Sequence, residues 1–133
     1  MYDDHGVERE FDRLRKRVHE LETNVNLPMF IKECTRVSDE HGWWPNGERN
    51  FGEAIALLHS ELSEALEEWR KDRGLFYVKD GKPEGILTEF ADLFIRAGDL
   101  LGHIATPEEF EQALLAKMKY NETRPFRHGG QKA

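Results

Sequence analysis

Apolar residues recur every three or four positions through most of this chain, which is the spacing of one face of an α-helix. The pattern is strictest near the start, where six apolar positions are spaced 4-3-4-3-4: Val7, Phe11, Leu14, Val18, Leu21 and Val25. We call these six positions the N-terminal seam. A seam of this kind, flanked by charges, is typical of helices that pack as coiled coils. Because strand signals are scarce elsewhere, the sequence predicts an all-α protein.

Four further helices are predicted, over about 28–42, 51–71, 83–104 and 107–123. The apolar faces of the first three of these are, in order, Phe30, Ile31, Cys34 and Val37; Phe51, Ile55, Leu58, Leu62, Ala65 and Trp69; and Ile86, Phe90, Leu93, Ala97, Leu100 and Ile104. Asn26 is a candidate N-cap for the helix that begins at Pro28. Thr106, Pro107 and Glu109 supply an N-cap, a first-turn proline and a capping box for the last helix. The chain therefore reads as a bundle of about five helices.

The segments between the helices carry turn residues. "GWWPNGERN", residues 42–50, combines glycine, proline and an Asn-Gly pair. Asp80-Gly81 predicts the turn of a small hairpin whose first strand is Phe76–Val78. No internal repeat or linker divides the chain, so we expect one domain over 1–133, with an N-terminal helix over 1–25 and a flexible basic tail over 125–133.

Composition limits the function classes. Hydrophobic residues make up 38% of the 133 positions and charged residues 34%, so the core is modest and a homodimeric or homotetrameric interface would help to bury apolar surface. A net charge of −7 argues against binding to a nucleic acid polymer, which needs a basic surface. Cys34 is the single cysteine, and neither a signal peptide nor an apolar run of about 20 residues is visible. We therefore expect a cytoplasmic protein that does not bind membranes.

Acidic residues follow two of the predicted helices at helical spacing. In "HSELSEALEEW", residues 59–69, Glu61, Glu64 and Glu68 are spaced 3 and 4 apart. The next helix carries a polar stripe beside its apolar face: Glu89, Asp92, Arg96, Asp99 and His103. If the two helices pack antiparallel, Glu61 and Glu64 face Glu89 and Asp92. We call these four residues the acid cluster.

A single acidic helix face is most often solvated, but two features favour a binding site here. The acids border the apolar stripe, and Glu61 and Glu89 have Ala65 and Leu93, rather than a base, four positions later. Two unit charges about 4 Å apart at an effective dielectric near 20 interact by about 4 kcal/mol. Four converging carboxylates therefore need protons or cations, and oxygen ligands alone favour Mg²⁺ or Mn²⁺. Zinc and di-iron sites fit less well, because no His/Cys cluster and no Glu-x-x-His pair occurs.

These motifs resemble a known family. "SELSE", followed by "EFAD" with 24 residues between Glu64 and Glu89, is similar to the Glu-x-x-Glu … Glu-x-x-Asp signature of the MazG-like all-alpha nucleoside triphosphate pyrophosphohydrolases. The flanking segments "NFGEAIALLHSELSEALEEWR", "GKPEGILTEFADLFIRAGDL" and "KMKYNETRPFRHGGQK" resemble the short single-domain branch. The resemblance covers roughly residues 43–132. It implies a helical bundle that assembles as a homo-oligomer with helices shared across the interface.

The resemblance also implies the chemistry. Glu61, Glu64, Glu89 and Asp92 would be the catalytic metal ligands, holding two or three Mg²⁺ or Mn²⁺ ions. The substrate would be a nucleoside triphosphate, expected to be a deoxynucleotide. Cleavage between its α and β phosphates would give a monophosphate and pyrophosphate. Ser60 stands where many family members have a further Glu, and Glu68 is a further candidate ligand. Two alternatives stay open: a sister activity (dUTP/dUDP hydrolase or phosphoribosyl-ATP pyrophosphohydrolase), or a non-enzymatic helical assembly module.

The candidate substrate-binding residues lie at the two ends of this region. Lys117, Tyr120, Asn121 and Arg124 share one helical face; they form either a phosphate-binding group or a solvated helix end. We call these four residues the basic group. Of Trp43 and Trp44, one is expected to pack and the other to stack on a base. Trp69 is expected in the core. His59 and His103 are expected to be structural or supporting, and Arg96 to pair with Asp92 or Asp99 and orient a ligand.

Overall fold

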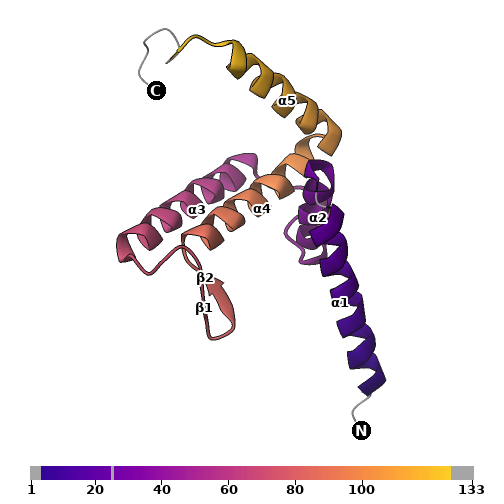
Figure 1. Cartoon of the computed structure of the whole chain (residues 1–133). Coiled ribbons are helices and arrows are strands. Elements are labelled where there is room, and N and C mark those ends of the chain that lie inside the picture. The colour runs from indigo at the N-terminus through magenta and orange to yellow at the C-terminus, as the bar shows by residue number, and fades with distance from the viewer. Residues whose placement is uncertain (1–3, 25, 127–133) are drawn as a thin grey trace.

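The computed structural model describes residues 4–24 and 26–126, and within them the chain is mainly helical, as predicted (Figure 1). The described part contains five α-helices, one 3₁₀ turn and one antiparallel hairpin: α1 (Asp4–Asn24), α2 (Leu27–Glu40), the 3₁₀ turn (Pro45–Gly47), α3 (Phe51–Lys71), β1 (Tyr77–Lys79), β2 (Lys82–Glu84), α4 (Ile86–Ile104) and α5 (Pro107–Thr123). A search of the described helices for one long and apolar enough to span a bilayer finds none. Most of the predicted tail lies outside the described residues.

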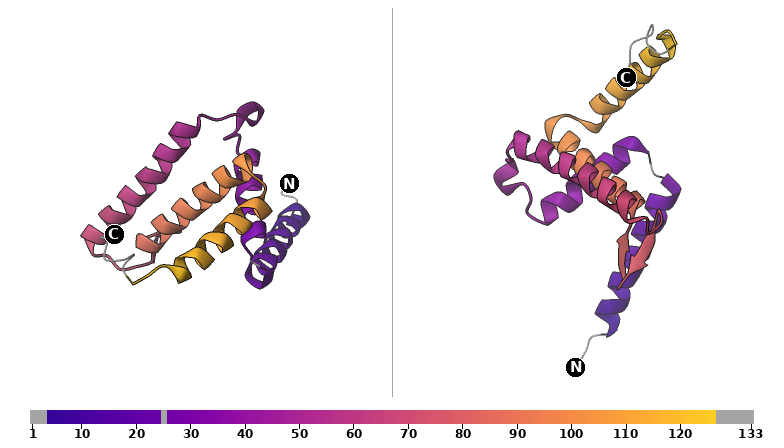
Figure 2. Two further views of the ribbon diagram at one scale, coloured as in Figure 1. Left: turned by 90° about the horizontal axis from the view of Figure 1, so that it is seen from above. Right: turned by 90° about the vertical axis from the view of Figure 1, so that its left-hand side faces the viewer.

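Helix α4 is the centre of the fold. It lies side by side with α3 and runs in the opposite direction, while α2 packs across it from another side (Figures 1 and 2). Helix α5 leaves the end of α4 and contacts α2 and α4. The antiparallel pairing of α3 with α4, on which the expected acid cluster depends, is therefore present.

Two glycines on α4 allow α2 to approach closely. A Cβ added at Gly98 would lie 3.0 Å from Cys34 Sγ, and one at Gly102 would lie 2.2 Å from Thr35 Oγ1. Their spacing of four positions places both on the same face of α4. The contact buries Ile31 and Cys34 of α2, as their sequence pattern predicts.

The predicted helix ends are confirmed where the end signals are local. The Asn26 side chain accepts a hydrogen bond from Met29 N at 3.0 Å and caps α2. Thr106 and Glu109 form the predicted capping box at the start of α5. The Thr106 backbone N–H, which donates to the Glu109 carboxylate, lowers the pKa of that group. Such caps each contribute about 1 kcal/mol.

The hairpin is confirmed, but it extends further than predicted. Its first strand is shifted by one residue relative to Phe76–Val78, and the second strand includes Pro83, which pairs with Val78. Helix α4 therefore begins at Ile86 instead of Pro83. Gly85 explains the late start: its φ of +106° is not helical, and a Cβ there would lie 2.6 Å from Leu75 O.

The predicted buried face of α3 is wrong in its rotation about the helix axis. Trp69, expected in the core, is 67% exposed, and Phe51 and Leu62 are exposed as well. Ala65 is buried as predicted, and the other buried residues of α3 are Ala54, Glu61 and Glu68. On α4, Leu100 is buried as expected, whereas Phe90 and Ile104 are exposed. The acid-bearing side of α3, and not its most apolar side, therefore packs toward the rest of the chain.

The described chain buries little apolar surface for its length. Its buried hydrophobic residues are Ile31, Cys34, Ala54, Ala65 and Leu100, and of these Ile31 is the most enclosed. An ion pair between Arg17 and Glu33 links α1 to α2, while Phe11 and Leu14 of the N-terminal seam are exposed. Val25 and the side chains of Val7, Val18 and Leu21 lie outside the described residues. Several large apolar side chains of the described helices therefore remain exposed, among them Trp69 and Phe94.

Candidate metal centre

Glu61 is the most buried acid of the acid cluster. It projects from the α4-facing side of α3 and retains 5% exposure. Its Oε1 accepts a hydrogen bond from Arg96 Nε of α4 at 2.6 Å, while its Oε2 has no hydrogen-bond partner within the described chain. A buried carboxylate oxygen without a partner is costly. A ligand of positive charge at Oε2 would remove that cost.

Three members of the acid cluster converge on one point. Glu61, Glu89 and Asp92 each place a carboxylate oxygen so that all three oxygens lie within 4.8 Å of one another. Glu64 stands beside them: it is exposed, but its carboxyl group is within hydrogen-bonding reach of Glu89. The fold therefore brings three of the four acids together from two helices, with exposed Glu64 beside them.

The pKa values in the acid cluster are raised, because its carboxylates are partly buried and repel one another. The pKa of Glu89 rises to about 7, because partial burial disfavours its charge and because Glu64, Asp92 and Glu61 repel it. Burial also raises the pKa of Glu61, although the Arg96 guanidinium opposes the rise. A divalent cation favours ionised carboxylates and would relieve both effects.

A second acidic group shares Glu89. Oxygens of Glu68, Glu84 and Glu89 also lie within 4.8 Å of one another. This group is less open to a cation, because Lys71 lies 3.7 Å and the Tyr77 hydroxyl 3.4 Å from Glu68, and Lys82 lies 3.5 Å from Glu84. Sequence reasoning missed Glu84, since it lies in the hairpin and has no helical spacing to the other acids.

Arg96 does not have the partner that its position in the helix predicts. It was expected to pair with Asp92 or Asp99, which lie four residues before and three residues after it on α4. It bonds to Glu61 of α3 instead. The reason is burial: Glu61 is enclosed between the helices, where an ionised carboxylate needs a cation more than the exposed Asp92 does.

Asp99 anchors the loop before α3 to α2 and α4. It is buried, and its carboxylate accepts hydrogen bonds from Ser38 Oγ at 2.8 Å and from Trp44 Nε1 at 3.0 Å, while His103 Nδ1 lies 3.1 Å away. The Trp44 ring stacks on the His103 ring with centroids 3.7 Å apart. Trp44 is therefore the tryptophan that packs, and His103 is structural. The link between Asp99 and residues 38 and 44 joins distant positions, so no spacing in the sequence signals it.

Trp43, Ser60 and His59 are the remaining candidates near the acid cluster. Trp43 is 59% exposed, and Arg49 lies over its ring at 5.9 Å. Ser60 is exposed, and its hydroxyl donates to Leu57 O within α3, so it takes up a helix bond instead of reaching the acids. His59 is exposed on α3.

The basic group lies on α5, away from the acid cluster. Lys117 and Arg124 flank the Tyr120 ring at 5.0 Å and 5.8 Å, and Asn121 is exposed beside them. Among the described residues α5 has no contact with α3, and it points away from the α3–α4 pair (Figure 1). Within one chain, the structure therefore does not bring the basic group to the acids.

The donor set fits a hard divalent cation. The site offers carboxylate oxygens only, one of them buried without a partner, and this chemistry suits Mg²⁺ or Mn²⁺ better than softer metals. No protein-family model, curated protein or solved structure matches the chain.

Proposed function

We propose that this protein is a metal-dependent nucleotide pyrophosphohydrolase that converts a nucleoside triphosphate to its monophosphate and pyrophosphate. The observation that carries the proposal is the unpartnered Oε2 of buried Glu61, which points to a cation among three convergent carboxylates. The resemblance of the two acidic motifs to the MazG-like family supports the same reaction. At a site of this kind, Mg²⁺ is bound by a few carboxylates together with phosphate groups of the substrate.

The proposed roles follow from the positions of the side chains. Glu61, Glu64, Glu89 and Asp92 would hold Mg²⁺ or Mn²⁺, which would supply Lewis acidity toward the phosphoryl group and toward water. Water attacks the α phosphorus, the bond from that phosphorus to the α–β bridging oxygen breaks, and pyrophosphate leaves with the electron pair of that bond while a proton of the water passes to solvent. Arg96 holds Glu61 in place through its Nε–H, so its role is to position a ligand.

We further propose that the functional form is a homo-oligomer in which the basic group acts on the acid cluster of a neighbouring copy. The exposed apolar residues of α3 and α4 support an interface, among them Leu62, Trp69 and Phe94. Lys117 and Arg124 lie far from the acids of their own chain, which supports a site shared between two copies. In this arrangement Lys117 and Arg124 stabilise the negative charge of the leaving pyrophosphate.

Subunit mixing tests whether each site is shared between two copies. Glu89→Gln and the double variant Lys117→Ala/Arg124→Ala are each expected to be inactive alone. When the two are unfolded, mixed in equal amounts and refolded together, a dimer in which each site draws on both chains recovers about a quarter of wild-type activity. Unmixed refolding of each variant is the control. No recovery, in mixtures shown by mass to contain hetero-oligomers, would place both groups of each site on one chain.

Pyrophosphate release from a panel of nucleotides tests the activity itself. With Mn²⁺ present we expect release from nucleoside triphosphates and none after addition of EDTA. Turnover confined to dUTP and dUDP, the latter with release of inorganic phosphate, or to phosphoribosyl-ATP would assign one of the sister activities instead. Activity that persists in EDTA would contradict the proposal.

A helical assembly module is the second candidate, and the exposure of Phe11 and Leu14 on α1 favours it. Thermal unfolding separates the two functions, because a ligand that binds only the folded state stabilises it. The stabilisation is about 2.7 kcal/mol at one hundred times the dissociation constant. A pyrophosphohydrolase is expected to melt at higher temperature in millimolar Mn²⁺, whereas a module with solvated acids is expected to show no shift.

A further inference from the structure

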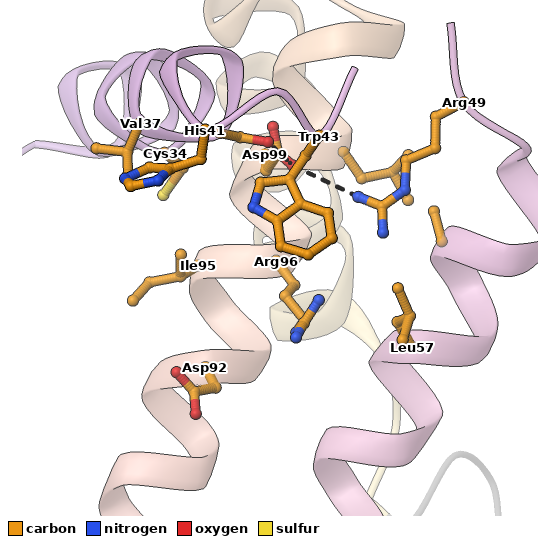
Figure 3. A pocket seen from close by; sticks show the side chains of 13 residues that line it. Cys34, Val37, His41, Trp43, Arg49, Leu57, Asp92, Ile95, Arg96 and Asp99 are labelled. Atoms are coloured by element: carbon orange, nitrogen blue, oxygen red, sulfur yellow. Dashed lines mark hydrogen bonds and ion pairs between the residues drawn. The ribbon is translucent and has the colours of Figure 1, made fainter. Parts of the chain in front are cut away.

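A cavity of about 210 Å³ opens beside the acid cluster (Figure 3). It lies between α2, the loop before α3, α3 and α4, and two of its lining residues, Asp92 and Arg96, belong to or contact the acid cluster. At roughly 30 Å³ per liquid water, the volume is about that of seven waters, comparable with one heteroaromatic ring system. A substrate whose phosphates lie at the carboxylates is therefore able to extend its other end into this cavity.

The two tryptophans of the loop have different roles at the cavity. Trp44 is engaged, because its ring stacks on His103 and its Nε1–H bonds to Asp99. Trp43 lines the cavity with much of its indole exposed, and Figure 3 shows its ring standing over the cavity between Arg49 and His41. An exposed indole face beside a cavity is a stacking platform for a flat ring.

The cavity offers hydrogen-bond donors and few acceptors. The Arg49 side chain is only 17% exposed, its contact with Asp99 is a loose 4.0 Å, and its guanidinium makes no hydrogen bond to another described residue. Arg96 engages Glu61 through Nε, which leaves its terminal nitrogens toward the cavity. Of the two carboxylates that line the cavity, Asp92 is assigned to the cations, and Asp99 already accepts from Ser38 and Trp44. A ligand that fits must therefore present acceptors.

The lining favours a base over a phosphate. Val37, Leu57 and Ile95 give the cavity an apolar side, which suits a flat ring and offers nothing to a phosphate. Asp99 neutralises part of the charge of Arg49 and would repel a phosphate placed beside it. The carboxylates with their cations remain the place for the phosphates.

We propose that this cavity binds the nucleobase and that Arg49 selects bases with two adjacent acceptors; the proposal rests on the proposed nucleotide substrate. Guanine presents O6 and N7 side by side and cytosine presents O2 and N3, and both match the fork of a guanidinium. Adenine places its N6 amino group, a donor, next to N7 and next to N1. The base stacks on Trp43 while Arg49 reads its edge.

Arg49→Lys tests the selection, because lysine keeps the charge and loses the fork. With Mn²⁺, wild-type kcat/KM for the better of GTP and CTP is expected to exceed that for ATP about ten-fold or more. Arg49→Lys is expected to reduce this ratio to within about two-fold of unity, mainly because kcat/KM for the preferred substrate falls. Arg70→Lys, which changes an exposed arginine paired with Glu67, is the matched control and keeps the wild-type ratio.

A binding measurement separates this proposal from the proposed hydrolysis. Guanosine and cytidine, added in EDTA, are expected to quench tryptophan fluorescence more strongly than adenosine, and Trp43→Leu is expected to remove the quenching. Equal kcat/KM for all bases, or a preference that survives in Arg49→Lys, would overturn the role of Arg49. Absence of quenching by every nucleoside would overturn the base site. If no nucleotide is hydrolysed, the hydrolase proposal fails, and the quenching series still decides whether bases bind.

Discussion

Replacing Glu89 with glutamine is expected to stabilise the metal-free protein at pH 8 and, at the same time, to abolish hydrolysis. Burial and the neighbouring carboxylates raise the pKa of Glu89 from 4.5 to about 7 in the folded state. The folded protein therefore favours the protonated carboxyl, and this contribution to stability is present below about pH 4.5 and lost as the pH rises through 7. Glutamine resembles the protonated form and does not acquire the charge.

Urea unfolding in EDTA at pH 5 and pH 8 measures the stabilising effect. The wild type is expected to lose up to about 2.5 kcal/mol more than Glu89→Gln over this interval. Solvent screening at the half-buried site makes the loss smaller than this upper bound. Turnover with Mn²⁺ is expected to fall at least about 100-fold. Glu67→Gln, an exposed change on α3, should alter neither quantity. A Glu89→Gln protein that turns over normally would remove Glu89 from the site.

Asp99→Ala is expected to destabilise the protein by about 3–5 kcal/mol, the cost of removing one partner from a buried charged network. The substitution leaves Ser38 Oγ and Trp44 Nε1 without their acceptor and removes the carboxylate beside His103 and Arg49. The loop that carries Trp43 then loses its anchor to α4. Asp99→Asn keeps one acceptor oxygen and should cost less.

Chemical unfolding of the variant measures this effect, with Glu67→Ala as the exposed control. The same preparations should show weaker nucleoside quenching of tryptophan fluorescence in Asp99→Ala than in the wild type. A loss of stability below about 1 kcal/mol, the worth of one ordinary hydrogen bond, would show that Asp99 does not anchor the loop.

Much of the helical framework could be predicted because its signals are local. Asn26, Thr106 and Glu109 act within one turn of the helices they cap, and Asp80-Gly81 forms its turn from its own positive φ angles. The convergence of the acids was predictable in part: spacings of three and four fix a side of each helix, while the antiparallel packing of α3 and α4 entered only as a condition. These inferences need no knowledge of distant residues.

The failures depend on packing between distant segments. On α3 the apolar stripe and the acidic stripe are neighbours, and a small rotation about the helix axis decides which one is buried. Contact with Arg96 buries Glu61, and Trp69 turns outward. The bonds from Asp99 to Ser38 and Trp44 join residues 61 and 55 positions apart. The position of Arg49 over two indole rings depends on the fold of the loop before α3.

A crystal grown with Mn²⁺ and a non-hydrolysable nucleotide would test the central claim most directly, because the anomalous signal of manganese locates the ion independently of the protein. We expect a peak bonded to Glu61 Oε2 and to oxygens of Glu89 and Asp92, with phosphate oxygens completing its coordination. A map with no peak between α3 and α4, in which Glu61 Oε2 bonds only to water or to another side chain, would contradict the account.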